Sequence, residues 1–129
     1  MRGIVTGSFD LLHAGHINLL KKAKKKCGYL IVGLHADPSI ERPHKNKPAE
    51  SILERTIKLR NCKWVDEIFV YETEADLSIL FKYINPDIRF LGSDAKDGRV
   101  ITDEGAAPIE YIDSLPIHTS ELRERIKNA

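Results

Sequence analysis

The chain has 129 residues and a formal net charge of +1 at pH 7, so its overall charge attracts neither nucleic acid nor an anionic membrane surface. No apolar run approaches the roughly 20 residues that cross a bilayer, and Met1–Thr6 is too short an apolar stretch for a secretory signal. Cys27 and Cys62 follow no metal or redox spacing, which predicts free thiols in a reducing cytoplasm. The length predicts one domain over residues 1–129.

The first predicted strand, Arg2–Thr6, runs into Gly7-Ser-Phe-Asp-Leu-Leu-His-Ala-Gly-His16, and a helix is expected from about Ala14. A glycine turn between a strand and a helix leaves backbone N–H groups unpaired, and the helix dipole adds positive charge there. Asp10 is expected to fix this turn. Four residues are candidates for cradling a phosphate through their backbone N–H groups: Thr6, Gly7, Ser8 and Phe9.

His13 and His16 lie three residues apart, so both imidazoles are expected on one side of the first helical turn. Gly15 has no Cβ and leaves room for a ligand close to the backbone. Two solvated histidines or a metal pair are the simpler alternatives. A helix N-terminus repels cations, however, and no Cys, Asp or Glu lies nearby at zinc-like spacing. We therefore expect phosphate chemistry without a protein metal site, by imidazoles whose protonation can shift near neutral pH.

The first helix is expected to continue to about Lys26 and to end at Gly28 as a glycine cap. Its five lysines between 21 and 26 form either a nucleic-acid surface or a solvated helical face. The second is favoured, because a helix dipole stabilises cations near the C-terminus. The next strand, Tyr29–Leu34, is an almost continuous apolar run, as expected of a parallel strand covered on both faces.

Ala36–Glu50 is polar and without periodicity, and a long loop of this kind in a small domain is usually functional or mobile. Lys47 lies in it, either as an ordinary surface lysine or as part of a cationic lid over phosphates. Ser51-Ile-Leu-Glu54 fits a capping box, which predicts a helix to about Cys62. Arg55 falls in the first turn of this helix, where a surface ion pair is the simplest role.

Three further strands are expected, at Glu67–Tyr71, Ile88–Leu91 and Ile109–Ile112. A helix between the first two starts near Thr73 and ends at Asn85-Pro86. Asp94 follows the next strand at the edge where open α/β sheets bind ligands, although it could simply cap a helix. The alternation predicts an α/β fold: a Rossmann-like, five-stranded, mostly parallel sheet with helices on both faces.

A second candidate phosphate site lies near the end of the sequence given. Thr119 and Ser120 can cap a helix while their hydroxyl and N–H groups face an anion. Arg123 lies one turn further on the same side. Capping alone would also explain the two hydroxyl residues, so this site depends on the first one.

Gly7–His16 resembles the signature of the cytidylyltransferase-like nucleotidylyltransferases, Gly-x-Phe-Asp-x-x-His-x-Gly-His, and within that family it is most similar to the glycerol-3-phosphate cytidylyltransferases. Trp64-Val-Asp-Glu67 resembles the family's Tyr-Val-Asp-Glu. Ile117–Arg123 resembles its Ile-Ser-Thr-Thr element and also the Ile-Ser-Ser-Thr-x-x-Arg element of related adenylyltransferases. One departure is Asp113-Ser-Leu-Pro116, which places a carboxylate where the glycerol-3-phosphate enzymes have a phosphate-contacting arginine.

The resemblance implies transfer of CMP from CTP to a phosphorylated small alcohol, glycerol 3-phosphate, with release of pyrophosphate. Residues and resemblance together predict catalytic roles for His13, His16, Lys47 and Arg123. Besides the four backbone positions Thr6–Phe9, they predict nucleotide-binding roles for Gly15, Arg55, Lys63, Asp94, Thr119 and Ser120. Mg²⁺ is expected mainly on the nucleotide phosphates, and the family implies a homodimer.

Other interpretations stay open, and Asp113 is the reason for the first two. An adenylyltransferase would use ATP with a sugar phosphate or FMN. A catalytically weakened nucleotide sensor would bind the triphosphate without turnover. A nucleic-acid module built on the lysine run is the third alternative, which a steep salt dependence of binding would reveal; neither nucleic acid nor a membrane is the expected partner.

Overall fold

The computed structural model describes residues 1–93, 107–113 and 124–126. Its elements in chain order are β1 (Arg2–Gly7), α1 (Ala14–Cys27), β2 (Tyr29–His35), α2 (Ile52–Arg60), β3 (Glu67–Tyr71), α3 (Glu74–Ile84), β4 (Ile88–Gly92) and β5 (Ile109–Ile112). Four predicted site residues lie outside the described residues: Asp94, Thr119, Ser120 and Arg123.

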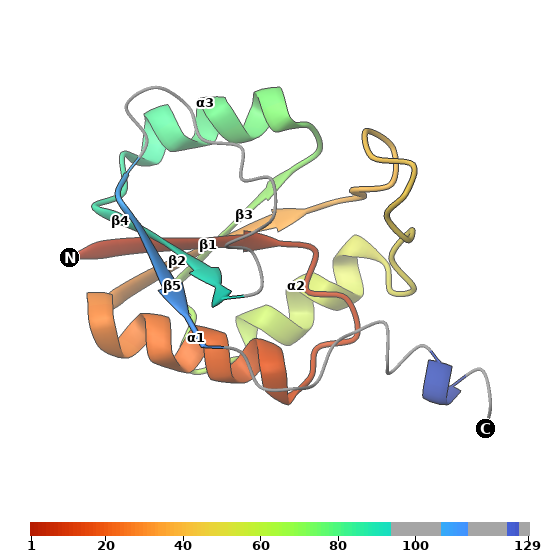
Figure 1. Cartoon of the computed structure of the whole chain (residues 1–129), viewed down its shortest axis with the longest axis horizontal. Helices are drawn as coiled ribbons and strands as arrows, with labels where there is room; N and C mark the ends of the chain where they lie inside the picture. The colour runs from red at the N-terminus through yellow and green to blue at the C-terminus, as the bar shows by residue number, and fades with distance from the viewer. Residues whose placement is uncertain (94–106, 114–123, 127–129) are drawn as a thin grey trace.

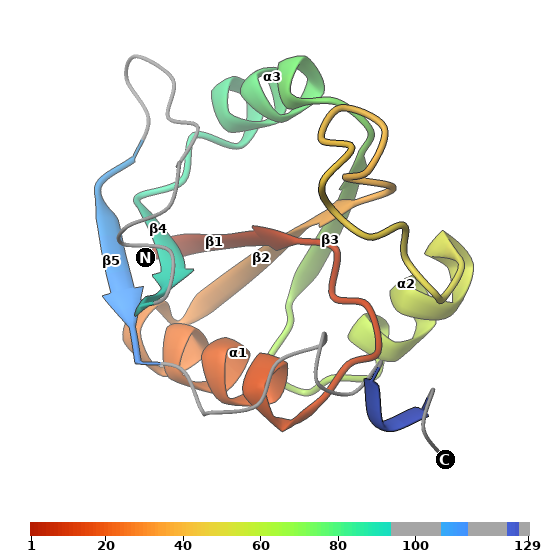
Figure 2. The ribbon, with the colours of Figure 1, turned by 45° about the vertical axis from the view of Figure 1, so that its right-hand side comes forward.

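The five strands form one sheet in the order β3-β2-β1-β4-β5, and every neighbouring pair is parallel. Figures 1 and 2 show α3 on one face of the sheet and α1 and α2 on the other. Right-handed crossovers produce this arrangement when the chain moves outward from β1 to β3 and then returns to the other side of β1. The predicted Rossmann-like α/β fold is confirmed, and its sheet is parallel throughout.

Successive side chains of the central strands point to opposite faces, so the sheet carries two apolar clusters. On the α1 and α2 side, Val5 packs in one cluster with Leu20. On the α3 side, Ile4 and Ile31 pack in the other with Leu77. Because β1 and β2 are buried on both faces, their sequences are almost continuously apolar.

Element boundaries follow the predicted signals closely. Each described strand agrees with its predicted range to within one residue at either end, and Gly28, at φ +83°, ends α1. The predicted capping box before α2 is present, but this helix ends at Arg60 rather than near Cys62. Asn61 takes the cap position, and its side-chain amide donates to the Ile57 carbonyl oxygen at 2.8 Å, which competes with continuation of the helix.

The remaining composition-based expectations concern the cysteines and the lysine run. Cys27 is buried, Cys62 is partly buried, and both are free thiols. Lys24 pairs with Asp66, while the other lysines of the run are exposed, as a solvated helical face requires. Within the described ranges, none of the helices has the length and apolar character needed to cross a membrane.

Candidate active site

The reversal of strand order beside β1 determines where a ligand can bind. The chain leaves β1 toward β2 and β3 and returns to β4 on the other side of β1. The loops that follow β1 and β4 therefore diverge at the carboxyl edge of the sheet, which is where open α/β sheets form ligand crevices. The signature Gly7–His16 occupies this position, because it contains the end of β1 and the start of α1.

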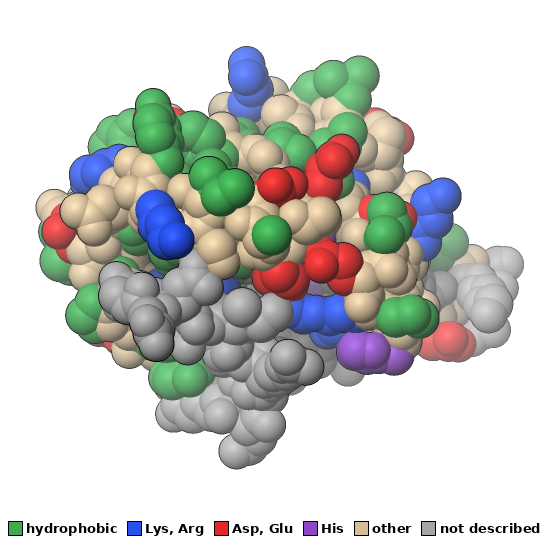
Figure 3. Space-filling model, turned by 90° about the horizontal axis from the view of Figure 1, so that it is seen from above, with side chains coloured by type: hydrophobic (Ala, Val, Ile, Leu, Met, Phe, Trp, Pro, Cys, Tyr) green, Lys and Arg blue, Asp and Glu red, His purple; other side chains and the backbone are tan. Residues whose placement is uncertain are grey.

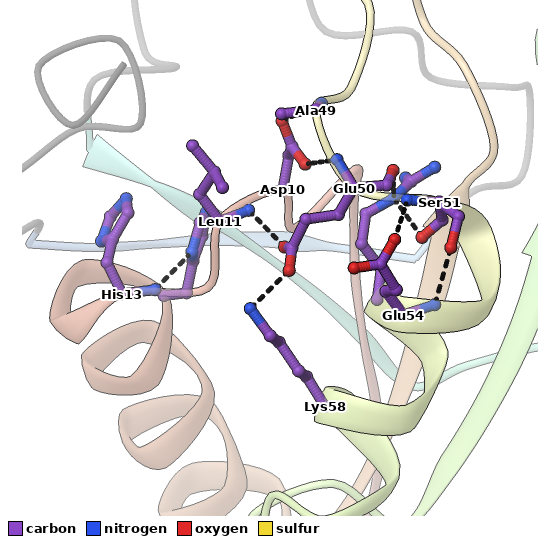
Figure 4. Close-up of polar contacts among 10 residues, drawn as sticks. Asp10, Leu11, His13, Ala49, Glu50, Ser51, Glu54 and Lys58 are labelled. Carbon is purple, nitrogen blue, oxygen red and sulfur yellow. Dashed lines mark hydrogen bonds and ion pairs between the residues drawn. The ribbon is translucent and has the colours of Figure 1, made fainter. Parts of the chain in front are cut away.

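The turn between β1 and α1 is held by a buried carboxylate. Phe9 (φ 48°) and Leu11 (φ 49°) have left-handed backbone conformations, and Asp10 lies between them with only 3% of its surface exposed. The Asp10 carboxylate accepts hydrogen bonds from the backbone N–H of Ala49 (2.8 Å) and of Glu50 (2.9 Å), as Figure 4 shows. Asp10 thus fixes the turn, as the sequence predicts, by fastening it to the loop before α2.

The two histidines form the cap of α1 itself. His13 is the N-cap residue, and its Nδ1 accepts from the backbone N–H of Gly15 at 2.9 Å. His16 Nδ1 accepts in turn from the backbone N–H of His13 at 3.1 Å. The two rings are stacked, with centroids 4.0 Å apart and planes 26° apart, and the Phe9 ring lies 5.5 Å from that of His16. The predicted pairing of the imidazoles on one side of the turn is confirmed.

These cap bonds decide which nitrogen of each ring can donate. Because Nδ1 accepts in both residues, a neutral ring carries its proton on Nε2, on the side away from the cap. Burial, and then the neighbouring His13, lower the pKa of His16 to about 4, against a smaller opposing effect of Asp10. His16 is therefore a neutral N–H donor at neutral pH. This corrects the expectation that its protonation shifts near neutral pH.

The start of α1 is electrostatically prepared for an anion. Its first turn contains no acidic residue, so no side chain of that turn compensates the positive end of the helix dipole. The three lysines of its last turn lie at the negative end. Thr6 at the end of β1 accepts a hydrogen bond from Arg89 Nη2 through its hydroxyl at 3.0 Å. The hydroxyl of Thr6 is thus engaged within the fold, and the predicted phosphate cradle depends on backbone N–H groups.

Arg55 is buried rather than placed on the surface. Only 2% of it is exposed, and burial lowers the pKa of its guanidinium group despite the nearby carboxylates. The guanidinium donates to backbone carbonyl oxygens of five residues, Ser8, His35, Ala36, Glu50 and Ser51. Arg55 therefore joins the signature turn, the end of β2 and the start of α2. A surface ion pair is excluded, and direct nucleotide contact stays a prediction.

The loop that carries Lys47 is attached at both ends. At its start the backbone N–H of Ala36 donates to the Tyr71 carbonyl oxygen at 2.9 Å, at its middle Arg42 forms an ion pair with Glu74 of α3, and its end is held by Asp10. Figure 3, which looks onto the α3 side, shows acidic side chains gathered beside basic and histidine side chains. Lys47 itself is exposed. Hydrogen bonds from Ser39 lower the pKa of Asp37 at the start of this loop, and the charge of Lys47 adds to that effect.

Lys63 lies away from the histidine pair, whereas Asp113 contacts α1. Lys63 follows α2 at the amino edge of β3, opposite to the edge where the signature lies, and its Nζ lies 4.6 Å from the centroid of the Trp64 ring. Its nucleotide-binding role stays a prediction that this position does not favour. Asp113 follows β5, and its carbonyl oxygen accepts from Asn18 of α1 at 3.2 Å. Its exposed side chain thus lies close to α1.

Two contributions to the site were not predicted from the sequence. Glu50 accepts from the backbone N–H of Leu11 at 2.7 Å, although the two residues are 39 positions apart. Arg89, a buried cation in β4, contacts Thr6 as described above. An arginine inside an apolar strand pattern was a usable signal for the second contact. No local pattern indicates the first.

Comparison with known proteins gives the following likenesses. A family model described as cytidylyltransferase-like matches residues 4–125. The bifunctional protein HldE of Campylobacter jejuni subsp. jejuni serotype O:6 (strain 81116 / NCTC 11828) is 34% identical over 124 residues, which are 95% of this chain and 27% of that protein. HldE of Helicobacter pylori (strain HPAG1) is 37% identical over 123 residues, 94% of this chain and 26% of that protein. The chain thus spans about a quarter of the length of these relatives.

Solved structures share the fold over nearly the whole chain. The lipopolysaccharide core biosynthesis protein from Thermoplasma volcanium GSS1 has a TM-score of 0.73 and 28% identity, covering 89% of this chain and 98% of that one. Pantothenate synthetase from Thermus thermophilus has a TM-score of 0.60 and 15% identity, covering 95% of this chain and 64% of that one. The second likeness concerns the fold alone.

Proposed function

Because the chain belongs to the cytidylyltransferase-like family and is a nucleotidyltransferase, we propose that it transfers AMP from ATP to a phosphorylated sugar and releases pyrophosphate. One observation carries the proposal. The N-terminus of α1, at the carboxyl edge of the sheet, presents two stacked imidazoles whose Nδ1 atoms accept from backbone N–H groups in the cap, so that each ring, when neutral, carries its donor hydrogen on Nε2. Such donors, at the positive end of the helix dipole, suit a polyphosphate.

A sugar phosphate as the acceptor is supported by the relatives. The structural neighbour that matches this chain over 98% of its own length is described as a lipopolysaccharide core biosynthesis protein. A lipopolysaccharide core is an oligosaccharide, and its assembly needs activated sugars in the form of nucleoside diphosphate sugars. Nucleotidyl transfer to a sugar phosphate makes such derivatives. ATP as the donor is supported by the likeness of Ile117–Arg123 to the adenylyltransferase element and by Asp113 in place of arginine.

The chemical step is an in-line displacement. A phosphate oxygen of the acceptor forms a bond to the α-phosphorus, and the bond from that phosphorus to the bridging oxygen of the β-phosphate breaks, so pyrophosphate leaves with the electron pair. No covalent intermediate on the enzyme is needed, and positioning and charge stabilisation supply the rate. The Nε2–H groups of His13 and His16 donate to oxygens of the α- and β-phosphates, where negative charge increases in the transition state.

Three cations complete the proposal. Lys47 and Arg123 bind the departing pyrophosphate or the acceptor's phosphate, and Arg55 shapes the cradle by holding the carbonyl groups around it. Among residues 1–93, 107–113 and 124–126, no group of three or more His, Cys, Asp and Glu could hold a metal ion. These residues form no protein cage for Mg²⁺. We therefore assign no step to it beyond the expected contact with the phosphates.

Transfer of CMP from CTP to glycerol 3-phosphate is the second candidate. It is favoured by the likeness of Gly7–His16 to the glycerol-3-phosphate cytidylyltransferases. The two candidates share the histidine pair and differ only in base and acceptor.

A pyrophosphate-release screen tests the proposal. ATP, CTP, GTP and UTP are each combined with sugar 1-phosphates, FMN and glycerol 3-phosphate, and products are identified by phosphorus NMR and mass spectrometry. The expected product is an adenosine diphosphate sugar. Turnover only with CTP and glycerol 3-phosphate would establish the second candidate instead. Tight triphosphate binding in calorimetry with no turnover in any combination would indicate a nucleotide sensor.

A further inference from the structure

The turn that orients the histidine pair contains two unfavourable backbone conformations. Phe9 and Leu11 both have φ near +50°, a region that residues with a Cβ rarely adopt and that costs roughly 1–2 kcal/mol per residue. Neither is glycine, asparagine or aspartate. Such conformations persist only where surrounding contacts hold them. The contacts that hold this turn therefore set the direction in which the chain enters α1 at His13.

Two carboxylates hold the turn reciprocally. The Asp10 side chain accepts from the backbone N–H of Glu50 at 2.9 Å, and the Glu50 side chain accepts from the backbone N–H of Leu11 at 2.7 Å. Figure 4 shows the Glu50 side chain reaching the Leu11 amide on one side and Lys58 on the other. The Leu11 bond acts directly on one of the two left-handed residues. It is formed by a side chain outside the signature.

Glu50 is well placed for this role because its charge is balanced. Its side chain is only 11% exposed, and its Oε2 pairs with Lys58 Nζ at 2.5 Å. Its carbonyl oxygen accepts from Arg55 Nε at 3.2 Å. A carboxylate with little access to water is stabilised by such partners. Glu50 thus connects α2 and the buried guanidinium group to the turn that presents the histidines.

We propose that Glu50 is a positioning residue for nucleotidyl transfer: by binding the Leu11 amide, it holds the turn that sets the place of His13 at the N-terminus of α1. The inference rests on the proposed function. It assigns Glu50 no contact with substrate. A displacement of the histidines by about 1 Å is enough to slow such a step by up to roughly a hundredfold, so the loss of this bond should appear in kcat.

Four variants separate the reach of the side chain from its charge. Glu50→Ala removes the acceptor. Glu50→Asp keeps the charge but is one methylene too short to reach Leu11. Glu50→Gln loses the charge but keeps an oxygen at the right distance. Glu54→Ala is the matched control, because it removes the carboxylate bond to Ser51 N–H at the start of the same helix without touching the turn.

We expect kcat to fall about tenfold to a hundredfold in Glu50→Ala and Glu50→Asp, with KM for the nucleotide changed less, because the histidines act mainly on charge that develops in the transition state. Glu50→Gln should recover to within severalfold of the parent, and Glu54→Ala should keep the parent kcat. Circular dichroism checks that each variant is folded. Full activity in folded Glu50→Asp, or equal losses in Glu50→Gln and Glu50→Ala, would overturn the positioning role.

An activity-free readout keeps this test independent of the substrate assignment. Amide hydrogen exchange by NMR reports on the Leu11 N–H in the unliganded protein. Protection in the parent and in Glu50→Gln, with faster exchange in Glu50→Asp, is expected whichever nucleotide is used. Absence of turnover in the parent with every substrate pair would refute the proposed function alone. Equal exchange of Leu11 in the parent and in all three Glu50 variants would refute the hydrogen bond on which the positioning role depends.

Discussion

Helices α1 and α2 both begin with a capping box, but the side chains that form it are imidazoles in α1 and a hydroxyl and a carboxylate in α2. In α1 the capping box is formed by His13 and His16, with no acidic residue in the first turn. In α2 it is formed by Ser51 and Glu54, whose hydroxyl oxygen and carboxylate accept from each other's backbone N–H at 3.1 Å. Both boxes satisfy backbone donors that a helix start leaves unpaired.

The difference lies in what remains after capping. At α2 the Glu54 carboxylate lies on the positive end of the helix dipole, and the backbone N–H of Ser51 lowers the pKa of that carboxyl group, so an external anion would be repelled. At α1 the cap uses imidazole nitrogens instead of a carboxylate: His16, whose pKa is lowered to about 4, is a neutral ring with its N–H on Nε2, and no acidic residue lies in the first turn. The α1 end can bind a phosphate for this reason. The α2 end stabilises the fold only.

Substitution of His16 should have the largest effect on the difference between the two helix ends. It can remove the Nε2–H donor while keeping the acceptor that caps the helix. His16→Asn keeps an acceptor near the position of Nδ1 but lacks a donor where Nε2 lies. It should fold with near-parent stability and lose about 10²–10³-fold in kcat, the usual cost of one transition-state donor. His16→Gln, which can place an amide donor near Nε2, should retain more activity. Pyrophosphate release and urea unfolding measure the two quantities.

The outcome for His16→Ala completes that series. It should lose both the donor and the cap bond, with a stability cost of about 1 kcal/mol as for other N-terminal caps. Pyrophosphate release at the parent rate in any folded variant that lacks the ring would exclude His16 from the chemistry.

The pH dependence of stability should distinguish the two caps next. The pKa of His16 is about 4 in the folded chain against an ordinary value of 6.5, so between these values the unfolded chain binds more protons than the folded one. Stability from this group is therefore complete above pH 6.5 and is lost as the pH falls toward 4. The loss is about 3 kcal/mol.

Urea unfolding at pH 7.5 and pH 4, in the parent and in His16→Asn, measures this contribution. Groups that do not interact with His16 contribute equally to both proteins, so the difference between the two pH dependences measures His16 together with its electrostatic coupling to His13 and Asp10. An identical pH dependence in the two proteins would show that the cap is not held by a neutral imidazole.

Much of this fold could be predicted because its signals are local. The strands are apolar runs bounded by turn residues, and helix starts such as Thr73 and Ser51 are marked by their own side chains. The histidine pair was also predictable, since a spacing of three residues at a helix start needs no tertiary information. Its tautomer was not, because that depends on which ring nitrogen meets a backbone N–H in the folded cap.

Arg55 and Glu50 show why the rest of the site could not be predicted. The sequence places Arg55 in the first turn of a helix, but its burial depends on the carbonyl groups of Ser8, directly after β1, and of His35, at the end of β2, which come from up to 47 residues away. Glu50 precedes a correctly predicted N-cap, yet its partner is an amide exposed by a left-handed leucine. Leucine carries no signal for that conformation, whereas glycine or asparagine would have done so.

The smallest expected effect comes from a substitution that gives α1 an acidic residue in its first turn, as α2 has. Ala14, the exposed first residue of α1, can be replaced by glutamate, with Ala14→Gln as the uncharged control. The added carboxylate should stabilise the helix by about 0.3–1 kcal/mol through the dipole. It should also weaken triphosphate binding by roughly fivefold to tenfold, because two like charges a few ångströms apart in water repel by about 1 kcal/mol.

Calorimetric titration with ATP and thermal unfolding at low and high salt give both numbers for Ala14→Glu. Salt should reduce the stability gain and the binding loss together, since both arise from exposed charge near one helix end. Stabilisation without weaker binding would mean that the triphosphate does not approach the α1 N-terminus. In that case the contrast between the two caps would concern stability alone, and the histidine pair would need another explanation.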